Sequence, residues 1–190
     1  MEHNIREIIN RNDIEFRRMY FKDHADEWNI LCASMDTIGD TTLTIDDFQE
    51  KGIGKANGER YLRLYGLLQA VFLQQDAIKF LYEVIQTSFD TSNVLKAWGS
   101  HSMKSWEELR RYRNLSSGHP IENKTFERGK TKRAMISRIT ISQKGFQLLI
   151  FDSDGSSTEF PYVDLGIDSY LVEAKAILSD VEHFLDSYQF

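Results

Sequence analysis

The sequence has a single cysteine, Cys32, among 190 residues, which excludes an internal disulfide. A chain without disulfides is typical of a reducing compartment, so we expect a cytoplasmic protein. Cys32 lies between Leu31 and Ala33, with no histidine or other base next to it in the sequence. We therefore expect a buried thiol rather than a nucleophile.

Long apolar segments are also missing. No stretch of eighteen consecutive apolar residues occurs, so we expect no membrane-spanning helix and no membrane partner. The first seven residues carry charges of both signs and lack an apolar core, which argues against a secretory signal.

Most of the usual catalytic motifs are absent as well. The chain has no Cys-x-x-Cys pair, and none of its five histidines has another histidine three to five residues away, so we expect no zinc site. The Gly-x-Ser-x-Gly turn of many serine hydrolases does not occur either. We expect neither a metal nor any other cofactor, so any chemistry has to come from protein side chains.

Charge is distributed unevenly along the chain. The net charge is −6, yet residues 110–133 contain eight basic and two acidic residues. An acidic protein is not expected to coat nucleic acid without specificity, whereas a confined basic segment can attract one polyanion. A solvated Lys/Arg-rich linker would have the same composition, and the sequence leaves both interpretations open.

Apolar residues that recur every three or four positions predict helices. The predicted helices cover residues 3–36, 59–87, 91–99, 105–117 and 169–187. Residues 37–58 contain four glycines and favour a long connection. Gln74, Gln75 and Asp76 interrupt the second helix, and we expect a solvent-facing corner there rather than a polar interface patch.

The pattern changes after residue 133. Three runs rich in β-branched and aromatic residues predict a small antiparallel meander, over Met135–Ser142, Phe146–Phe151 and Thr158–Val163. Such a sheet is too small to fold alone. We expect a mainly α fold, a bundle of four to five helices that forms a single domain over residues 1–190. Its helical core covers about 3–120 and 168–188, and the meander, about 133–164, is inserted before the C-terminal helix.

Arg113 has an unusual place in the predicted helix at 105–117. At 100° per residue it falls within the arc that Trp106, Leu109 and Tyr112 define, so its guanidinium lies on the apolar face. A buried arginine is costly unless it has an acidic partner, extends along the apolar surface to water, or binds an anion. The sequence leaves these three possibilities open.

The end of this helix determines where His119 can reach. Gly118 suits a left-handed terminating residue, and Pro120 cannot continue the helix. The break would free the imidazole to turn toward Arg113 or toward a twofold-related copy of it. A plain helix exit with an exposed histidine is the alternative.

Arg113, Asn114 and His119, with five residues between the arginine and the histidine near a helix end, resemble the motif of the HEPN superfamily. In that superfamily of helical-bundle proteins, an arginine is followed by four to six residues and a histidine, commonly with a polar residue directly after the arginine. The resemblance covers residues 59–120 and the closing helix but not the meander. Many members look like metal-independent endoribonucleases.

The resemblance implies that Arg113, Asn114 and His119 are catalytic and that cleavage uses the 2′-hydroxyl of the RNA. His119 would transfer a proton, Arg113 would stabilise charge on phosphorus, and Asn114 would position one of them. The basic residues expected to bind RNA are Arg110, Lys124, Arg128, Lys130, Lys132 and Arg133.

Partners also follow from the resemblance. Two subunits of such proteins bring their motifs together, so a homodimer is expected. Prokaryotic members often act as toxins paired with an antitoxin protein, or in phage defence. Some members lack nuclease activity, and a catalytically inactive dimerisation or binding module is the alternative function.

Overall fold

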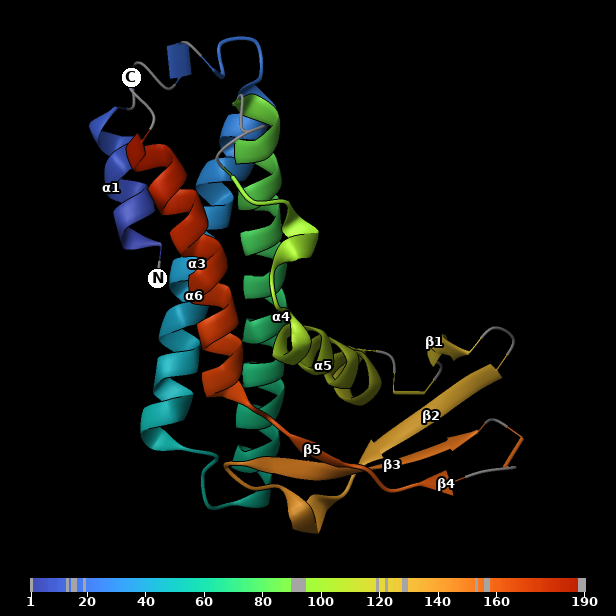
Figure 1. The fold of residues 1–190 in the computed structure, drawn as a ribbon. Coiled ribbons are helices and arrows are strands. Elements are labelled where there is room, and N and C mark those ends of the chain that lie inside the picture. The colour runs from blue at the N-terminus through green and yellow to red at the C-terminus, as the bar shows by residue number, and fades with distance from the viewer. Residues whose placement is uncertain are drawn as a thin grey trace. The chain divides into compact units, whose positions relative to one another are not determined.

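The structure, a computed structural model, describes residues 2–12, 14, 17–18, 20–89, 95–118, 120–121, 123–127, 130–152, 154–155 and 158–187. It is mainly helical, with a small antiparallel sheet inserted before the C-terminal helix, as the sequence predicts (Figure 1). The chain divides into two compact units. Unit 1 comprises residues 1–43, 73–103 and 168–190, and unit 2 comprises residues 44–72 and 104–167.

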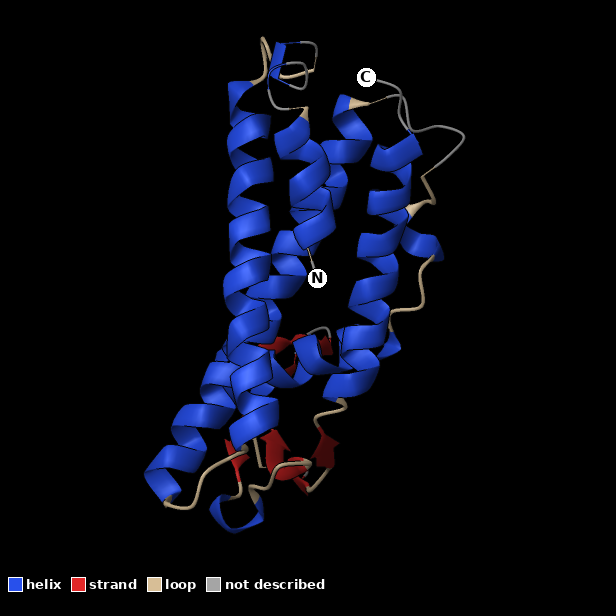
Figure 2. Cartoon of the chain, turned by 90° about the vertical axis from the view of Figure 1, so that its left-hand side faces the viewer, coloured by secondary structure: helices blue, strands red, loops and turns tan. Residues whose placement is uncertain are grey.

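Five α-helices lie within the described residues: α1 (His3–Arg11), α3 (Ala25–Lys51), α4 (Asn57–Ser88), α5 (Lys104–Arg113) and α6 (Ile167–Ser187). The strands are β1 (Asn123–Glu127), β2 (Lys130–Ile136), β3 (Gly145–Asp152), β4 (Thr158–Glu159) and β5 (Tyr162–Asp164). Among the described residues, strands occur only in unit 2 (Figure 2). Helices α3 and α4 contribute residues to both units.

Unit 1 is a helical bundle in which α1, α6 and parts of α3 and α4 run alongside one another (Figure 1). All four helices place large apolar side chains in its core, including Ile5, Ile9, Leu31, Ile38, Ile78, Leu81, Ile177 and Phe184. Burial of this many apolar side chains is what stabilises helices against the entropy of ordering them.

A hydrogen-bonded glutamine lies within the core of unit 1. Gln74 Nε2 donates to Thr42 Oγ1 at 3.0 Å, and Tyr170 Oη donates to Gln74 Oε1 at 2.9 Å. Gln74 and its neighbour Gln75 are both buried, so the solvent-facing corner expected here is wrong. The amide of Gln74 tolerates burial because α3 and α6 supply partners for both of its ends.

The N-terminal segment differs from the prediction of one helix over residues 3–36, because α1 and α3 are separate helices. Between them the backbone turns, with a hydrogen bond from His24 N to Phe21 O. Helix α3 then begins with Asp26 and Glu27 in its first turn, where negative charge interacts favourably with the helix dipole. These polar start signals outweigh the apolar spacing that continues across the turn.

Residues 37–51 are helical rather than part of a long connection, which corrects a second expectation. Ile38, Ile45 and Phe48 are buried and continue the apolar face of α3. Threonine hydroxyls in this stretch donate to carbonyls four residues earlier, so they do not disrupt the helix. The connection shrinks to residues 52–56, where two glycines have positive φ.

The remaining helices begin and end within two residues of the predicted positions for α4, α6 and the start of α5. The short helix expected over 91–99 is only partly described, since residues 90–94 lie outside the described residues. Residues 95–97 are not helical, so the expected helix is wrong there, and a 3₁₀ turn covers Trp98–Ser100.

The sheet of unit 2 begins earlier than expected, because residues 123–127 form β1 and residues 130–133 form the first half of β2. The strand order is β1-β2-β3-β4, all antiparallel, and β5 pairs with β3. One face of β3 is buried through Phe146, Leu148 and Ile150. In the same unit, the Tyr61 hydroxyl of α4 donates to the carbonyl of Ile136 at 3.4 Å.

Candidate functional site

Arg113 is the last residue of α5 and is followed directly by a π-helical turn, Asn114–Gly118, which we call the π turn. On α5, Trp106 and Leu109 are buried, Arg113 is half-buried and Arg111 is exposed. The helical-angle argument is therefore confirmed, because Arg113 shares the inward face of α5.

The guanidinium of Arg113 is held by contacts to α4 and to the π turn. Its Nη2 donates to Gln69 Oε1 at 2.9 Å, and its Nη1 donates to Asn114 Oδ1 at 3.1 Å. Its Cζ lies 3.8 Å from the ring centroid of Phe72, a close cation–π contact. These three contacts orient the guanidinium against α4 and the π turn.

A second arginine contacts the same ring. Arg110 Cζ lies 4.5 Å from the centroid of Phe72. Two guanidinium groups held against one ring concentrate positive charge, and an anion placed beside them would relieve their mutual repulsion. Two arginines of the last turn of α5 therefore lie against the same ring of α4.

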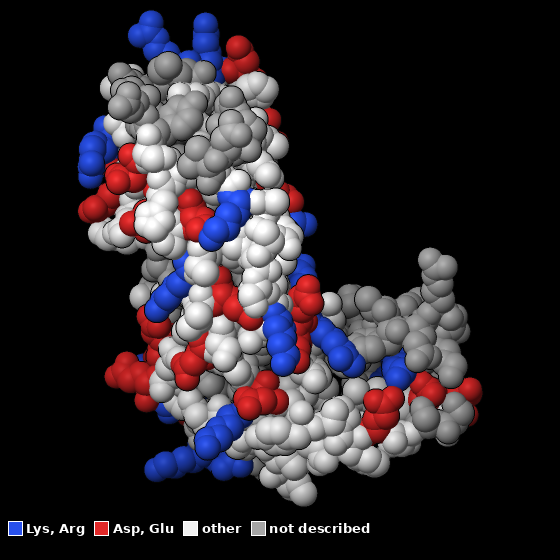
Figure 3. Space-filling model, in the orientation of Figure 1, with Lys and Arg blue, Asp and Glu red and all other residues white. Residues whose placement is uncertain are grey.

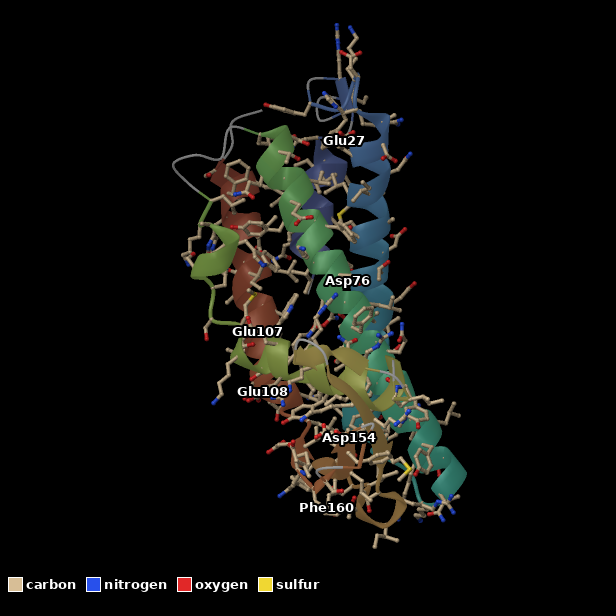
Figure 4. All side chains as sticks on the ribbon, turned by 90° about the vertical axis from the view of Figure 1, so that its right-hand side faces the viewer. Glu27, Asp76, Glu107, Glu108, Asp154 and Phe160 are labelled. Carbon is tan, nitrogen blue, oxygen red and sulfur yellow. The ribbon has the colours of Figure 1, made fainter. Side chains whose placement is uncertain are left out.

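Two acidic residues precede the arginines on α5. Glu107 and Glu108 belong to its first turns and are exposed (Figure 4), whereas the arginines occupy its last turn. This order complements the helix dipole, since anions stabilise the N-terminal end and cations the C-terminal end. It also separates these two carboxylates from Arg113 along the helix.

The π turn is stabilised by its own hydroxyl groups. Ser116 Oγ donates to the carbonyl of Tyr112 at 2.7 Å, and Ser117 Oγ donates to the carbonyl of Arg113 at 3.2 Å. Leu115 is completely buried and anchors the turn. Single π turns at the end of an α-helix are frequent at functional sites, because they redirect side chains that a regular helix would place elsewhere.

Gly118 does not have the left-handed conformation expected of a terminating glycine, since it is not among the glycines with positive φ. Its role is steric. A Cβ atom at Gly118 would lie 2.8 Å from Arg113 Nη1 and 3.4 Å from Asn114 Oδ1. The backbone of the π turn passes directly against the guanidinium, so a side chain at this position would displace the flexible end of Arg113.

His119 itself lies outside the described residues. Its neighbours in the chain are described: Gly118 ends the π turn, and the carbonyl of Pro120 accepts a hydrogen bond from Ala134 N on β2 at 2.8 Å. The chain on both sides of His119 is therefore fixed within unit 2.

Of the other basic residues expected to bind RNA, Lys124 lies on β1, and Lys130, Lys132 and Arg133 lie on β2. These two strands replace the linker considered from the sequence. Lys132 Nζ forms an ion pair with Glu159 Oε1 at 2.9 Å, so its charge is partly neutralised. Arg133 is half-buried, and neighbouring strand residues point to opposite faces of a sheet. Three further candidates have side chains outside the described part of the chain: Lys124, Arg128 and Lys130.

Opposite charges are mixed over the described surface in Figure 3, where Lys and Arg alternate with Asp and Glu. No continuous field of one sign extends over this face.

Sequence reasoning missed Gln69 and Phe72, which orient Arg113. They lie one helical turn apart on α4, more than forty residues before Arg113. Neither the position of Gln69 in the sequence nor that of Phe72 indicates a contact with Arg113. An exposed glutamine and a half-buried phenylalanine are both ordinary on a helix.

No protein-family model, curated protein or solved structure matches the chain. Among the described residues, no helix is both long and apolar enough to cross a membrane. The described His, Cys, Asp and Glu side chains form no group of three or more that could hold a metal ion.

Proposed function

We propose that this protein is a HEPN-like, metal-independent endoribonuclease that cleaves RNA by attack of the 2′-hydroxyl. The observation that carries the proposal is the guanidinium of Arg113. It lies at a π turn, is oriented by Gln69 and Asn114 through neutral oxygens, and shares an aromatic ring with Arg110. That arrangement favours a phosphate group.

In the proposed reaction, the 2′-hydroxyl oxygen attacks the adjacent phosphorus and the bond to the 5′-oxygen of the next nucleotide breaks. The products are a 2′,3′-cyclic phosphate and a 5′-hydroxyl. His119 removes the proton from the 2′-hydroxyl or donates one to the leaving oxygen, and each such role contributes about 10²–10⁴-fold in rate. Arg113 stabilises the charge on the phosphorane.

Asn114 is a positioning residue in this scheme, because its side-chain oxygen accepts a hydrogen bond from Arg113 Nη1. Cleavage needs both a base and an acid, and the motif offers one histidine per chain. The proposal therefore includes a homodimer, in which the His119 of a second copy takes the complementary role. A toxin or phage-defence role with an antitoxin partner belongs to the same proposal.

The proposal is tested by incubating the purified protein with RNA in a chelator, beside His119→Ala. The parent is expected to cleave the RNA, and His119→Ala is expected to be slower by about 10²–10⁴-fold, because proton transfer is lost. Cleavage is measured on a labelled RNA by gel electrophoresis. Equal rates for the two proteins would contradict the assignment of His119.

A binding module without catalysis is the competing function, and one observation favours it. Arg113 links α5 to α4 through Gln69 and Phe72, which is also what a structural arginine would do. The two functions differ in what the loss of Arg113 changes. A structural arginine affects the free energy of unfolding, whereas a catalytic one affects the rate of cleavage.

Gly118→Ala separates these effects. The added Cβ would meet the flexible end of Arg113 rather than backbone, so the guanidinium moves and the fold is retained. We expect the free energy of unfolding to change by less than about 1 kcal/mol. The cleavage rate should fall by about tenfold or more, since misplaced catalytic groups lose transition-state stabilisation. A parent-like rate would show that the close approach of Gly118 is unimportant.

A further inference from the structure

A hollow of about 470 Å³ lies in unit 1, beside the turn that precedes α3. Its volume is within the range of small-molecule binding sites. Three cations and two aromatic side chains line it, namely Arg17, Arg18, Lys22, Phe21 and Trp28. None of these residues takes part in the proposed cleavage site.

Positive charge predominates in the described lining of this hollow, which includes no carboxylate. Trp28 lines it from α3, one helical turn after Ala25. At 100° per residue, Asp26 and Glu27 fall on other sides of α3 (Figure 4 labels Glu27). Glu27 Oε1 lies 3.3 Å from His24 Nδ1. In a chain of net charge −6, this hollow is a local site for an anion.

The start of α3 adds to this charge. Ala25 is the first residue of this 27-residue helix and lines the hollow. Backbone N–H groups in the first turn of a helix favour an anion, and here Asp26 and Glu27 of the same turn offset part of this effect.

The aromatic part of the lining is positioned for stacking. Phe21 packs edge-on against Trp28, with 5.5 Å between the ring centroids, and fixes the indole. Arg17 Cζ lies 5.4 Å from the centre of the Trp28 ring. Because Arg17 is exposed, its guanidinium can move aside, and a planar base can then stack on the half-buried indole in its place.

We propose that this hollow binds a nucleoside phosphate. The base stacks on Trp28, and the phosphate binds Arg18 and Lys22. Both halves of the ligand follow from the lining, since an aromatic face selects a planar ring and clustered cations select a phosphate. The proposal does not depend on the ribonuclease function, because it uses other residues in the other unit.

Isothermal titration calorimetry with AMP, ribose 5-phosphate and adenosine tests the proposal. The full chain carries Arg113→Ala and His119→Ala, which removes the proposed cleavage site as a source of binding. AMP is expected to bind about tenfold or more tightly than ribose 5-phosphate or adenosine, because only AMP uses both the ring and the cations. Equal affinity for ribose 5-phosphate would overturn the proposal, as would no measurable binding of AMP.

Charge reversal locates the binding. Arg18→Glu with Lys22→Glu is expected to weaken AMP binding by about tenfold or more. The matched control reverses two exposed lysines of unit 1, Lys79→Glu with Lys175→Glu, and should leave the affinity within about twofold. Equal weakening by the two double variants would contradict the site.

Two further measurements complete the test. Binding of AMP should quench tryptophan fluorescence, and Trp28→Phe should remove this quenching while keeping an aromatic ring for stacking. Unchanged quenching in Trp28→Phe would overturn the placement of the base.

A 5′-phosphorylated RNA tetramer identifies the source of the ligand. Tighter binding of the tetramer than of AMP supports the end of an RNA strand as the ligand, and binding no tighter than that of AMP supports a free nucleotide.

Discussion

Arg113→Ala is expected to lower the rate of RNA cleavage by about 10²–10³-fold, the usual effect of removing a group that stabilises developing charge in a transition state. The two hydrogen bonds to Gln69 and Asn114 are lost as well, but Gln69 is exposed and its amide can bind water. We therefore expect the free energy of unfolding to fall by no more than about 2 kcal/mol. Single-turnover cleavage and urea denaturation measure the two quantities.

Arg111→Ala is the matched control for this variant. Arg111 lies on the same helix and is exposed. Its Cζ lies 5.7 Å from the centroid of the Tyr112 ring. Its loss should leave the cleavage rate within about threefold, since a surface charge is screened by salt. Arg113→Lys keeps the positive charge but loses the planar guanidinium, which donates to Gln69 and Asn114 at the same time. Its cleavage rate should therefore lie between those of the parent and Arg113→Ala. A similar loss of rate in Arg111→Ala and Arg113→Ala would remove the special role of Arg113.

Gln74→Leu is expected to lower the free energy of unfolding by about 1–3 kcal/mol, although leucine is apolar and close in size. The reason is the Tyr170 hydroxyl, which is completely buried and donates to Gln74 Oε1 at 2.9 Å. Burial raises the pKa of Tyr170 well above its ordinary value, so the hydroxyl remains a donor that needs an acceptor. Thr42 also loses the amide that it accepts from.

Tyr170→Phe provides the second side of a double-mutant cycle. In the Gln74→Leu background it removes the hydroxyl that has lost its Gln74 acceptor, so it should restore about 1 kcal/mol of the lost stability, whereas in the parent it should be destabilising. Urea denaturation of the four proteins measures the coupling. Strict additivity of the two substitutions would show that the buried hydrogen bond contributes nothing.

The parts of the fold that the sequence predicts well have a strong helical periodicity of apolar residues. Helices α4 and α6 and the start of α5 fall where the apolar spacing places them. The C-terminal half of α3 was missed because its threonines, aspartates and one glycine resemble a connection. Ile38 and Ile45 nevertheless continue its buried face, and hydroxyl groups bond to carbonyls of the same helix.

The candidate site was predicted in part. Helical geometry alone places Arg113 on the inward face of α5, because only the angle between neighbours on one helix is needed. Its contacts with Gln69 and Phe72 depend on how α5 packs against α4, which local spacing does not encode. The π turn was also missed, since a pattern of 3.6 residues per turn cannot mark one wider turn. The sequence therefore predicts a left-handed Gly118, whereas the structure gives it no positive φ and places it directly against the Arg113 guanidinium.

The two proposed sites differ in how their cations are held. At the end of α5, Arg113 is oriented by hydrogen bonds to Gln69 and Asn114, which suits a group that must meet a transition state. In the hollow beside α3, Arg18 and Lys22 are exposed, which suits reversible binding of a ligand.

The decisive measurement compares two short RNAs in a chelator, identical except for one 2′-deoxynucleotide at the preferred cleavage position. If Arg113 and His119 promote attack by the neighbouring hydroxyl, the all-ribose strand is cut there to give a 2′,3′-cyclic phosphate, and the substituted strand remains intact at that linkage. Cleavage of both strands at the same linkage and rate would contradict this chemistry, because the substituted strand has no hydroxyl to attack.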